Sequence, residues 1–407
     1  MDSSIAISAR LLTYFLRAIT WAPEDHAVET RKGKQTIMDP RTQPPFPRAR
    51  LLAFDGGGIR GLFALQYARR IETLLREKTG KPGLVLADYF HYIGGTSTGA
   101  IIAAFLSWGL PVAEVERLYR ENAAAMFRKS GLMQRFTSHR FVAEGLSEFL
   151  KSFFVEADGS LATLGSARLK TLLLVVTRNA STGSPWPLTN NPAGKYNNRD
   201  SPGDNLQIPL WQLVRASTAA PTFFPPEVLE VKGQHGEPLV FAFEDGGITP
   251  FNNPAYLLQM MATLPEYNLA WEAAREKMSL VSIGTGGTRA GRGDQLFVDI
   301  LAQAKNIPAS LISSFANYQD MLCRVHGECR FGHALDGELG AMIRPSPDAK
   351  FLYARYDKHF NEDDLKQAAT VTQKGFTLDN LELIDFLIEC GARDAQESVQ
   401  LSHFDDV

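Results

Sequence analysis

The amino-acid sequence predicts an α/β fold with three layers, α/β/α, in which helices cover both faces of a mostly parallel central sheet and a helical cap region is added. Two observations predict this class. Between residues 51 and 109, a short apolar strand, a glycine-rich turn and a helix follow one another twice. Residues 172–177 read Leu-Leu-Leu-Val-Val-Thr, an apolar run that indicates a strand buried on both faces, and therefore a sheet between two layers of helices.

The spacing of apolar residues predicts the elements in order. A buried strand is expected at residues 51–54 and another at about 89–93, each followed by glycines. Further strands are expected at 228–231, 239–243, 278–283 and 351–356. Helices are expected at about 62–78, 100–108, 111–127, 209–219, 255–263, 294–330 and 380–390, the last ended by Gly391. Residues 179–204 are rich in Asn, Gly, Pro and Ser and are expected to form a long surface loop.

The chain divides into three parts. Residues 1–49 form an N-terminal extension and linker, because an amphipathic stretch is followed by a polar segment that contains several prolines. Residues 50–360 form the main domain. Within it, residues 130–164 mix aromatic and basic side chains and are a candidate cap over an apolar site, or else an amphipathic helix pair packed on the core. Residues 361–407 are expected to form a C-terminal helical segment packed on the domain.

Composition and charge exclude several classes of protein. The chain has 407 residues and a net charge of -3, with a pI near 6.3, and so lacks the basic signature of a protein that binds nucleic-acid polymers. Its three cysteines, Cys323, Cys329 and Cys390, show neither metal-ligand spacing nor a disulfide framework, so a reducing cytoplasm is the expected location. No apolar run reaches the roughly 18 residues that a bilayer span requires.

Three turns at predicted strand ends carry candidate chemistry. Gly95-x-Ser97-x-Gly99, between a strand and a helix, is the nucleophile-elbow pattern, which projects a serine side chain beside the positive end of a helix. The glycine run at residues 55–61 offers uncovered backbone N–H groups that can hold an oxyanion or a phosphate. Asp245 ends a predicted hairpin strand next to two glycines, where another part of the chain can approach its carboxylate.

Three motifs resemble, in pattern and in order, those of the patatin-like phospholipase family: Asp55-Gly56-Gly57-Gly58-Ile59-Arg60-Gly61, Gly95-Thr96-Ser97-Thr98-Gly99 and Asp245-Gly246-Gly247. The resemblance covers about residues 50–360 and implies a patatin-like fold and a lipid acyl hydrolase with a Ser–Asp dyad, without a histidine, a metal or another cofactor. Carried over, Ser97 is the nucleophile and Asp245 the base. The oxyanion segment then contains Gly57, Gly58 and Arg60. The elbow contains Gly95 and Gly99. The supporting positions of the motifs are Gly56, Gly61, Gly246 and Gly247.

Residues 210–226 and 320–327 are similar to bacterial patatin-like effectors of CBASS-type anti-phage signalling. This finer resemblance implies activation by a cyclic dinucleotide and action from the cytoplasm, peripherally, on inner-membrane phospholipids. The implied partners are the phospholipid substrate, the cyclic dinucleotide and a second copy of the chain as a candidate homo-oligomer. Two clusters carry the cationic and aromatic groups that a dinucleotide needs: Arg324, Arg330, His326 and Phe331, and Tyr196, Lys195, Arg199 and Trp186.

Four alternatives remain open at the level of the sequence. A constitutive housekeeping lipid or ester hydrolase would use the same site without a nucleotide. A Ser–His–Asp α/β-hydrolase would need His326, His333 or His359, although only one strand precedes the elbow here. The spacing Gly56-x-Gly58-x-x-Gly61 also matches the fingerprint of dinucleotide-binding oxidoreductases. The fourth alternative is a non-catalytic lipid-binding protein. In the Ser–Asp assignment, Asp55 is expected to cap its turn rather than to take part in catalysis.

Overall fold

A nine-stranded sheet forms the middle of the molecule, with strand order β5-β6-β3-β2-β1-β7-β10-β9 and with β4 paired to β3 outside this path. The computed structural model describes residues 39–42, 47–127, 139–197, 204–221, 223–232, 237–288, 300–374 and 377–405. The strands of the sheet are β1 (Ala49–Phe54), β2 (Tyr92–Thr96), β3 (Leu172–Asn179), β4 (Ser184–Thr189), β5 (Glu227–Lys232), β6 (Pro238–Asp245), β7 (Met278–Ile283), β9 (Glu328–Phe331) and β10 (Leu352–Tyr356). A separate pair joins β8 (Gly287–Thr288) to β11 (His359–Phe360).

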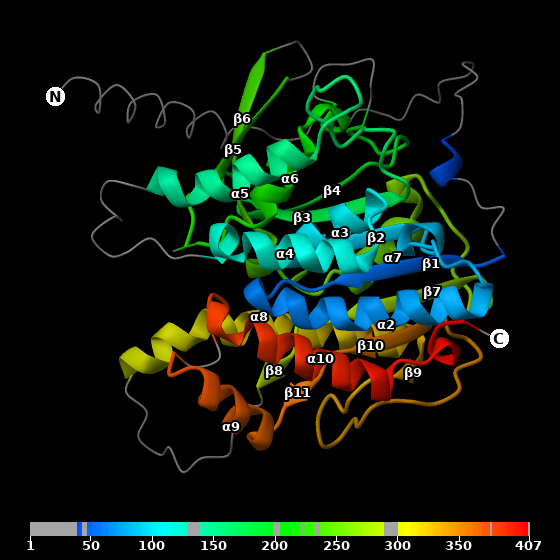
Figure 1. Ribbon diagram of the computed structural model, residues 1–407. Helices are drawn as coiled ribbons and strands as arrows, with labels where there is room; N and C mark the ends of the chain where they lie inside the picture. The colour runs from blue at the N-terminus through cyan, green and yellow to red at the C-terminus, as the bar shows by residue number, and fades with distance from the viewer. Residues whose placement is uncertain are drawn as a thin grey trace.

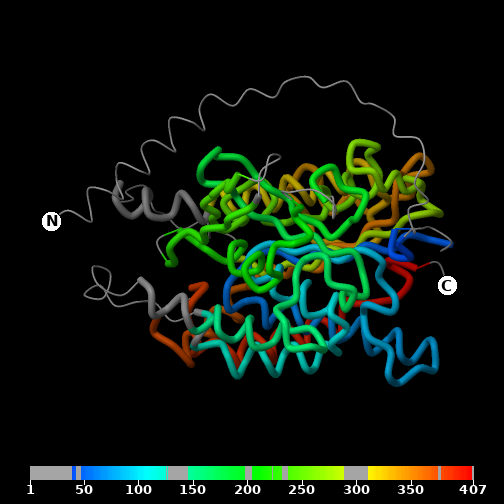
Figure 2. The backbone as a smooth tube through the Cα atoms, turned by 90° about the horizontal axis from the view of Figure 1, so that it is seen from above, coloured from blue at the N-terminus to red at the C-terminus, as the bar shows by residue number. Residues whose placement is uncertain are grey.

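Helices cover both faces of this sheet, as Figure 1 shows. They are α2 (Gly61–Thr79), α3 (Thr98–Ser107), α4 (Val112–Phe127), α5 (His139–Phe153), α6 (Leu210–Ser217), α7 (Ala255–Thr263), α8 (Ile300–His326), α9 (Glu362–Val371) and α10 (Ile384–Ser398). In Figure 2, the blue, cyan and red segments of α2, α4 and α10 lie on one side of the sheet, and the yellow-green α7 lies on the other. The structure therefore has the three-layer α/β/α architecture that the sequence predicts.

The side chains of the central strand explain why both faces must be covered. In β1, Leu52 and Phe54 belong to the core under α2, α3 and α10, whereas Leu51 and Ala53 belong to a second core under α7. All four side chains are fully buried. Successive residues of a strand point to opposite faces, so an apolar run without polar alternation requires a helical layer on each side. The strands β3, β2, β1, β7, β10 and β9 pair in parallel, and β4, β5 and β6 pair antiparallel.

The segment expected to be a long loop contains a strand, so that prediction was wrong. Ser184–Thr189 forms β4, which pairs antiparallel with β3 along six residues. Its sequence, Ser-Pro-Trp-Pro-Leu-Thr, has prolines at positions 185 and 187. Residues two apart in a strand direct their N–H groups to the same side, so both missing N–H groups fall on one edge, which suits a strand paired on its other edge alone.

The predicted C-terminal helix does not end at Gly391, and this prediction was also wrong. A short 3-10 turn at Leu381–Leu383 leads into α10, which continues through Gly391 to Ser398. A Cβ atom on Gly391 would lie 2.9 Å from Gln66 Cγ and 3.0 Å from Phe63 Cδ2. Glycine is used here because α10 packs closely on α2, not because the helix ends.

Gly391→Ala is expected to destabilise the protein by about 1–3 kcal/mol, since the added methyl group would push α10 away from α2. The free energy of unfolding in urea measures this. Gly83→Ala is the matched control, because a Cβ at that position meets nothing within 4 Å. Equal stability of the two variants would show that the contact between α2 and α10 adapts to the methyl group without cost.

The candidate cap region falls partly outside the described residues, because residues 128–138 are not described. Its remaining helix, α5, packs on α4 and α6. Leu146, Leu150 and Phe154 are buried, and the Phe105 ring on α3 stacks on Phe154 with the ring centroids 5.3 Å apart. The described part of the segment is therefore joined to the core, and a capping role for the whole segment stays a prediction. Residues 1–38 likewise lie outside the described residues.

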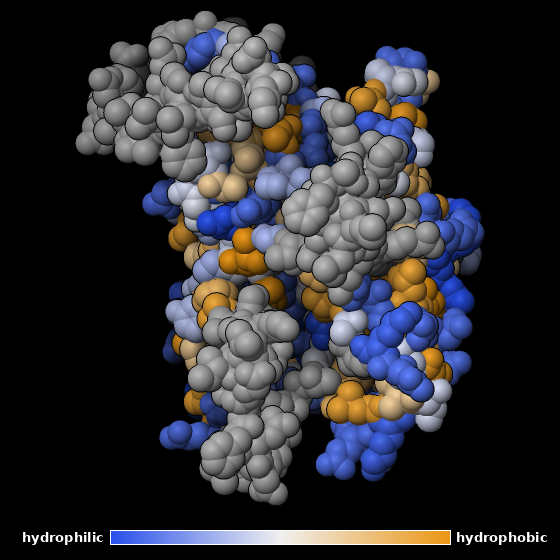
Figure 3. Space-filling model, turned by 90° about the vertical axis from the view of Figure 1, so that its left-hand side faces the viewer, coloured by the Kyte–Doolittle hydropathy of each residue, from blue (hydrophilic) through white to orange (hydrophobic). Residues whose placement is uncertain are grey.

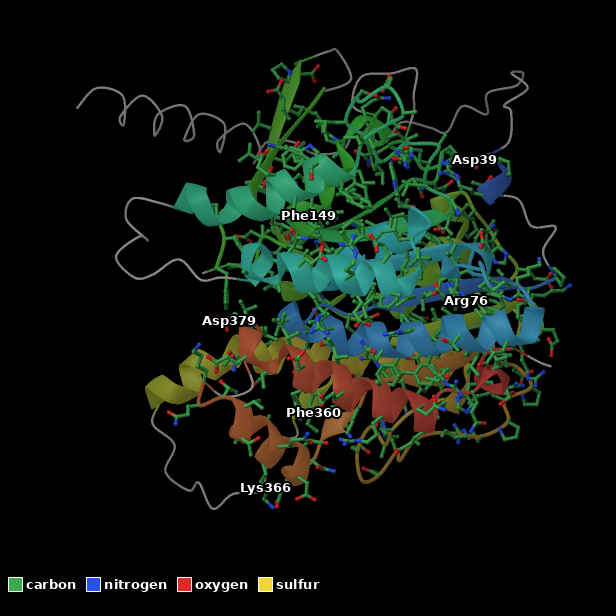
Figure 4. The ribbon with its side chains drawn as sticks, in the orientation of Figure 1. Asp39, Arg76, Phe149, Phe360, Lys366 and Asp379 are labelled. Carbon is green, nitrogen blue, oxygen red and sulfur yellow. The ribbon has the colours of Figure 1, made fainter. Side chains whose placement is uncertain are left out.

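The parallel strands end on the side of the molecule where α2 begins. In Figure 4, Arg76 in the last turn of α2 lies to the right, so α2 begins on the left-hand side, where Asp379 is also drawn. Figure 3 looks onto this left-hand side and shows apolar and polar surface intermixed. Ligand sites of open parallel sheets form where the strands end, so this side holds the candidate site.

Candidate active site

Ser97 occupies a sharp turn between β2 and α3. Its backbone has φ 55° and ψ −122°, a conformation that non-glycine residues rarely adopt. The turn is closed by two glycines: a Cβ on Gly95 would lie 2.0 Å from the carbonyl oxygen of Gly99, and one on Gly99 would lie 2.3 Å from that of Phe54. The predicted elbow is therefore formed, and it presents the half-buried Ser97 side chain at the end of β2.

Ser97 and Asp245 meet because two strands end head to head on one edge of β3. Thr96, the last residue of β2, pairs with Val176, and Asp245, the last residue of β6, pairs with the next residue, Thr177. Since β2 and β6 run in opposite directions, the residues that end them face each other. Ser97 Oγ donates a hydrogen bond of 2.6 Å to Asp245 Oδ2. The two residues that the sequence predicts to act together are thus in contact, although 148 positions separate them.

The last residue of α6 and the loop that follows it fix the backbone of Ser97 and Asp245. Ser217 Oγ accepts a hydrogen bond of 2.9 Å from the N–H of Ser97 and donates one of 2.7 Å to the carbonyl of Val176. The N–H of Asp245 donates to the carbonyl of Ala219 at 3.0 Å. No local pattern in the sequence indicates these two contacts, although residues 210–226 carry a family resemblance. Ser217 ties the elbow to β3 and so sets the height of Ser97 above the sheet.

Burial makes the Asp245 carboxylate a stronger base than an ordinary aspartate. The side chain is 5% exposed. Desolvation raises the pKa of Asp245 to about 6, although hydrogen bonds from Ser97 and from the N–H of Gly247 and the charge of Arg215 act in the opposite direction. Gly247 N donates to Asp245 Oδ1 at 2.7 Å, which leaves Oδ2 for Ser97. Gly246 is required because its Cβ would lie 2.3 Å from the carbonyl of Val176.

Asp245→Asn is expected to stabilise the fold at pH 7 by up to about 3 kcal/mol, because the wild-type carboxylate is ionised there in a buried place. The pKa of Asp245 rises on folding from 3.8 to about 6, so its contribution to stability falls as the pH rises from about 4 to about 6. Urea unfolding of both proteins at pH 4 and pH 7 measures this. The increase in the free energy of unfolding caused by Asp245→Asn should be present at pH 7 and small at pH 4. A variant that is less stable than the wild type at pH 7 would contradict this prediction.

The glycine run after β1 lies beside this pair with two N–H groups available. In the part of the chain that the structure describes, the N–H groups of Gly57 and Gly58 make no hydrogen bond. The carbonyl of Gly58 is turned away and accepts hydrogen bonds from Thr98 Oγ1 at 3.0 Å and Tyr119 Oη at 2.8 Å. Gly58 has φ +58°, and a Cβ there would lie 2.3 Å from the carbonyl oxygen of Leu378. This conformation explains the choice of glycine.

Contacts from other elements hold the glycine run in place. Gly56 N donates to the carbonyl of Asn252 at 3.1 Å, and Asn252 Nδ2 donates to the carbonyl of Gly56 at 3.3 Å. A Cβ on Gly56 would lie 3.1 Å from Ser97 Cβ, so the run passes directly beside the elbow. Gly61 begins α2, where a Cβ would lie 2.8 Å from Tyr119 Oη.

The two charged residues of this motif have structural contacts. Arg60 Nη1 donates to the carbonyl of Gly286 at 2.7 Å, so the side chain fastens the glycine run to the loop after β7. Asp55 does not cap its turn as expected. Its two carboxylate oxygens accept hydrogen bonds of 2.7 and 2.6 Å from Arg355 on β10. A buried carboxylate requires such a partner, and the bidentate pair joins the base of the glycine run to the sheet.

The histidines of the alternative triad lie in other contacts. His326, at the end of α8, stacks on the Tyr256 ring with the centroids 5.4 Å apart. His333 and His359 help to line a small cavity that also contains Arg324 and Arg355 and does not include Ser97 or Asp245. The Ser97 hydroxyl donates to a carboxylate and not to an imidazole.

The members of the first candidate nucleotide cluster make contacts with other residues, and the second cluster is described only in part. Arg324 is buried and donates to both carboxylate oxygens of Asp320, at 2.9 and 2.6 Å. Phe331 stacks on His403, and Arg330 donates to Glu328. In the second cluster, Arg199 lies outside the described residues. The remaining members are engaged as follows: Lys195 lies near the ring of Tyr196, and Trp186 packs on Phe241 and Phe243.

The described residues contain neither a metal-binding cluster nor a helix that could span a membrane. No group of three or more His, Cys, Asp or Glu side chains with the geometry of a metal site occurs among them. None of their helices combines the length and the apolar composition needed to cross a bilayer.

Known proteins match the part of this chain that contains the candidate site. The family model described as "Patatin-like phospholipase" matches residues 52–258, which include Ser97 and Asp245. A cGAMP-activated phospholipase of Vibrio cholerae is 32% identical over 216 residues, and one of Escherichia coli is 27% identical over 241 residues. Patatin-17 of Solanum cardiophyllum is 29% identical over 253 residues. These alignments cover 52%, 59% and 58% of this chain, and 56%, 63% and 60% of the relatives' own lengths.

Proposed function

Because the chain belongs to the patatin-like phospholipase family, we propose that it is a serine lipid acyl hydrolase of the phospholipase A type, with Ser97 as nucleophile and Asp245 as base. The observation that carries the proposal is the 2.6 Å hydrogen bond from Ser97 Oγ to Asp245 Oδ2. It lies beside a glycine run in which the N–H groups of Gly57 and Gly58 have no hydrogen-bond partner among the described residues. A serine hydroxyl becomes a strong nucleophile only when a base accepts its proton, and the raised pKa of Asp245 suits that task.

The reaction follows from this geometry in two steps. Ser97 Oγ attacks the ester carbonyl carbon of a phospholipid while its proton passes to Asp245 Oδ2. The carbonyl oxygen becomes an oxyanion, which the N–H groups of Gly57 and Gly58 stabilise; one such donor is typically worth about 3–4 kcal/mol. The C–O bond to the lysophospholipid then breaks, and Asp245 returns the proton to that oxygen. In the second step water attacks the carbonyl carbon of the acyl-Ser97 ester while Asp245 takes up its proton. The bond from this carbon to Ser97 Oγ then breaks, Asp245 returns the proton to Ser97 Oγ, and the fatty acid is released.

The pH profile of kcat/KM is expected to rise with pH through a single acid limb near pH 6 and to be level above about pH 7. Asp245 must be ionised to accept the Ser97 proton, and burial raises the pKa of Asp245 to about 6. Release of fatty acid from mixed micelles between pH 4.5 and 8.5 measures the limb. A limb near pH 4, where unperturbed carboxylates titrate, would contradict a buried base.

Activation by a cyclic dinucleotide is the finer part of the proposal. Two of the relatives are named cGAMP-activated phospholipases, and this chain spans 56% and 63% of their lengths. On this reading the enzyme remains inactive in the cytoplasm until the nucleotide binds, and then acts peripherally on the phospholipids of the inner membrane as part of an anti-phage response. A constitutive housekeeping hydrolase is the competing function for the same catalytic pair.

Release of fatty acid from phospholipid vesicles, with and without a panel of cyclic dinucleotides that includes cGAMP, tests both parts. Stimulation of at least ten-fold by one nucleotide, with no release by Ser97→Ala, supports the whole proposal. Release of fatty acid that does not change with any nucleotide supports the proposed hydrolase activity and contradicts the proposed activation. Binding of lipid without any release, under all conditions, would instead identify a lipid-binding protein and overturn the proposal.

A further inference from the structure

Arg215 is a buried cation without a salt bridge in the described structure. It lies in the last turn of α6 and is 1% exposed. Its Nε and Nη1 atoms have no hydrogen-bond partner in the part of the chain that the structure describes. The nearby carboxylate of Glu227 accepts from Gln212 Nε2 at 2.9 Å. An unpaired buried charge is expensive, and such groups persist where the charge has a use.

A second unpaired donor lies on the same side of α6. Trp211 Nε1 is buried and has no partner among the described residues. Trp211 precedes Arg215 by one helical turn, and side chains four residues apart share one face of a helix. Lys151 of α5 lies beside them, with its Nζ 4.5 Å from the centre of the Trp211 ring and 2.9 Å from Glu148 Oε1, with which it forms an ion pair. One face of α6 thus carries three buried N–H groups and the Arg215 charge, and Lys151 of α5 lies next to that face.

This donor cluster lies next to the candidate catalytic pair. Two residues after Arg215, Ser217 accepts the N–H of Ser97, and two residues further on Ala219 accepts the N–H of Asp245. The charge of Arg215 is close enough to act on the carboxylate of Asp245. The ring of Phe224 lies over the Arg215 guanidinium at 4.9 Å and is itself only half-buried, so it separates the charge from solvent.

We propose that Arg215, Trp211 and Lys151 form a subsite for a phosphodiester group. The proposal rests on the proposed function and deepens it. A guanidinium fork matches two phosphate oxygens, and the indole N–H can donate to one of them. The ammonium of Lys151, which is paired with the exposed carboxylate of Glu148, can exchange that partner for a phosphate oxygen at the rim. The Phe224 ring must turn aside to admit the ligand. Phospholipids and cyclic dinucleotides both carry a phosphodiester, and both fit this chemistry.

Kinetics on charged and neutral substrates test the subsite. The variants are Trp211→Phe, which removes one N–H group, and Arg215→Met, which keeps the length and removes the charge. The substrates are phosphatidylglycerol and diacylglycerol in the same detergent micelles. We expect KM for phosphatidylglycerol to rise at least ten-fold more than KM for diacylglycerol in both variants. Lys366→Ala, which removes an exposed charge on α9, is the control and should leave KM for both substrates unchanged.

A binding measurement distinguishes the two sources of the phosphodiester. If the ligand is the nucleotide, Arg215→Met should weaken the binding of labelled cGAMP at least ten-fold, while KM for phosphatidylglycerol at saturating cGAMP stays unchanged. Equal increases in KM for both lipids, with unchanged binding of cGAMP, would overturn the proposed subsite. Arg215 would then be a positioning residue for Asp245. Hydrolysis of diacylglycerol by the wild type, absent in Ser97→Ala, tests the proposed function separately.

Folding of the variants offers an independent check. Because the Arg215 charge is buried and has no ion-pair partner among the described residues, Arg215→Met should leave the melting temperature unchanged or raise it. A residue that served only structure would lower it on removal. Marked loss of stability in Arg215→Met, with wild-type kinetics of Trp211→Phe on phosphatidylglycerol, would overturn the proposal.

Discussion

Ser97→Ala is expected to lower the hydrolysis of phospholipid esters by about 10⁴-fold or more, because it removes the hydroxyl on which the proposed acyl intermediate forms. The Ser97 hydroxyl is the group that donates to Asp245, and the glycine run with free N–H groups lies directly beside it. The remaining activity would reflect binding and the N–H groups alone. Release of radiolabelled fatty acid over long incubations gives the range that this measurement needs.

Two controls accompany this variant. Ser97→Gly should be equally inactive and more stable than Ser97→Ala by about 1–2 kcal/mol, because glycine adopts the backbone of residue 97, with φ 55°, without strain. Ser160→Ala changes an exposed serine and should leave activity intact. Substantial activity in both variants at position 97 would show that the nucleophile lies elsewhere.

Asp245→Asn is expected to lower kcat about 10³-fold or more with a smaller change in KM. The amide has the shape of the carboxylate but cannot take up the proton of Ser97 Oγ, so the loss falls on the chemical step. Together with the gain in stability at pH 7 described above, this would separate a catalytic role from a structural one.

Alanine replacements of His326, His333 and His359 provide the matched comparison. They should each keep more than half of the activity, since those rings lie in contacts that do not involve the Ser97 hydroxyl. The dyad is wrong if Asp245→Asn remains active while one of these three variants does not.

Local patterns were enough to predict the parts of the site that lie within one turn of chain. The elbow follows from the glycines on either side of Ser97, because each closes a contact that a Cβ would block. Asp245 has no such local signature, and its assignment depended on the order of three motifs. The structure supplies the physical reason that the sequence lacks: the pairing of β2 and β6 with neighbouring residues of β3.

Contacts between distant segments were beyond prediction. Ser217 supports the elbow across 120 positions, and Arg355 pairs with Asp55 across 300. The strand β4 was missed because its two prolines read as loop, although prolines are tolerated on the outer edge of a sheet. In the same way, Gly391 was taken as a helix end because close packing against α2 leaves no trace in the local pattern.

The attachment of β6 has a consequence for the dynamics of catalysis. Only three residue pairs join β6 to β3, whereas β1 pairs along its length with strands on both sides. The carboxylate of Asp245, the proposed base, therefore lies at the root of a projecting arm, which Figure 1 shows rising above the sheet. Amide hydrogens near Phe243 should exchange with deuterium sooner than those of β1, and turnover would then track the local opening of this arm rather than the global stability of the protein.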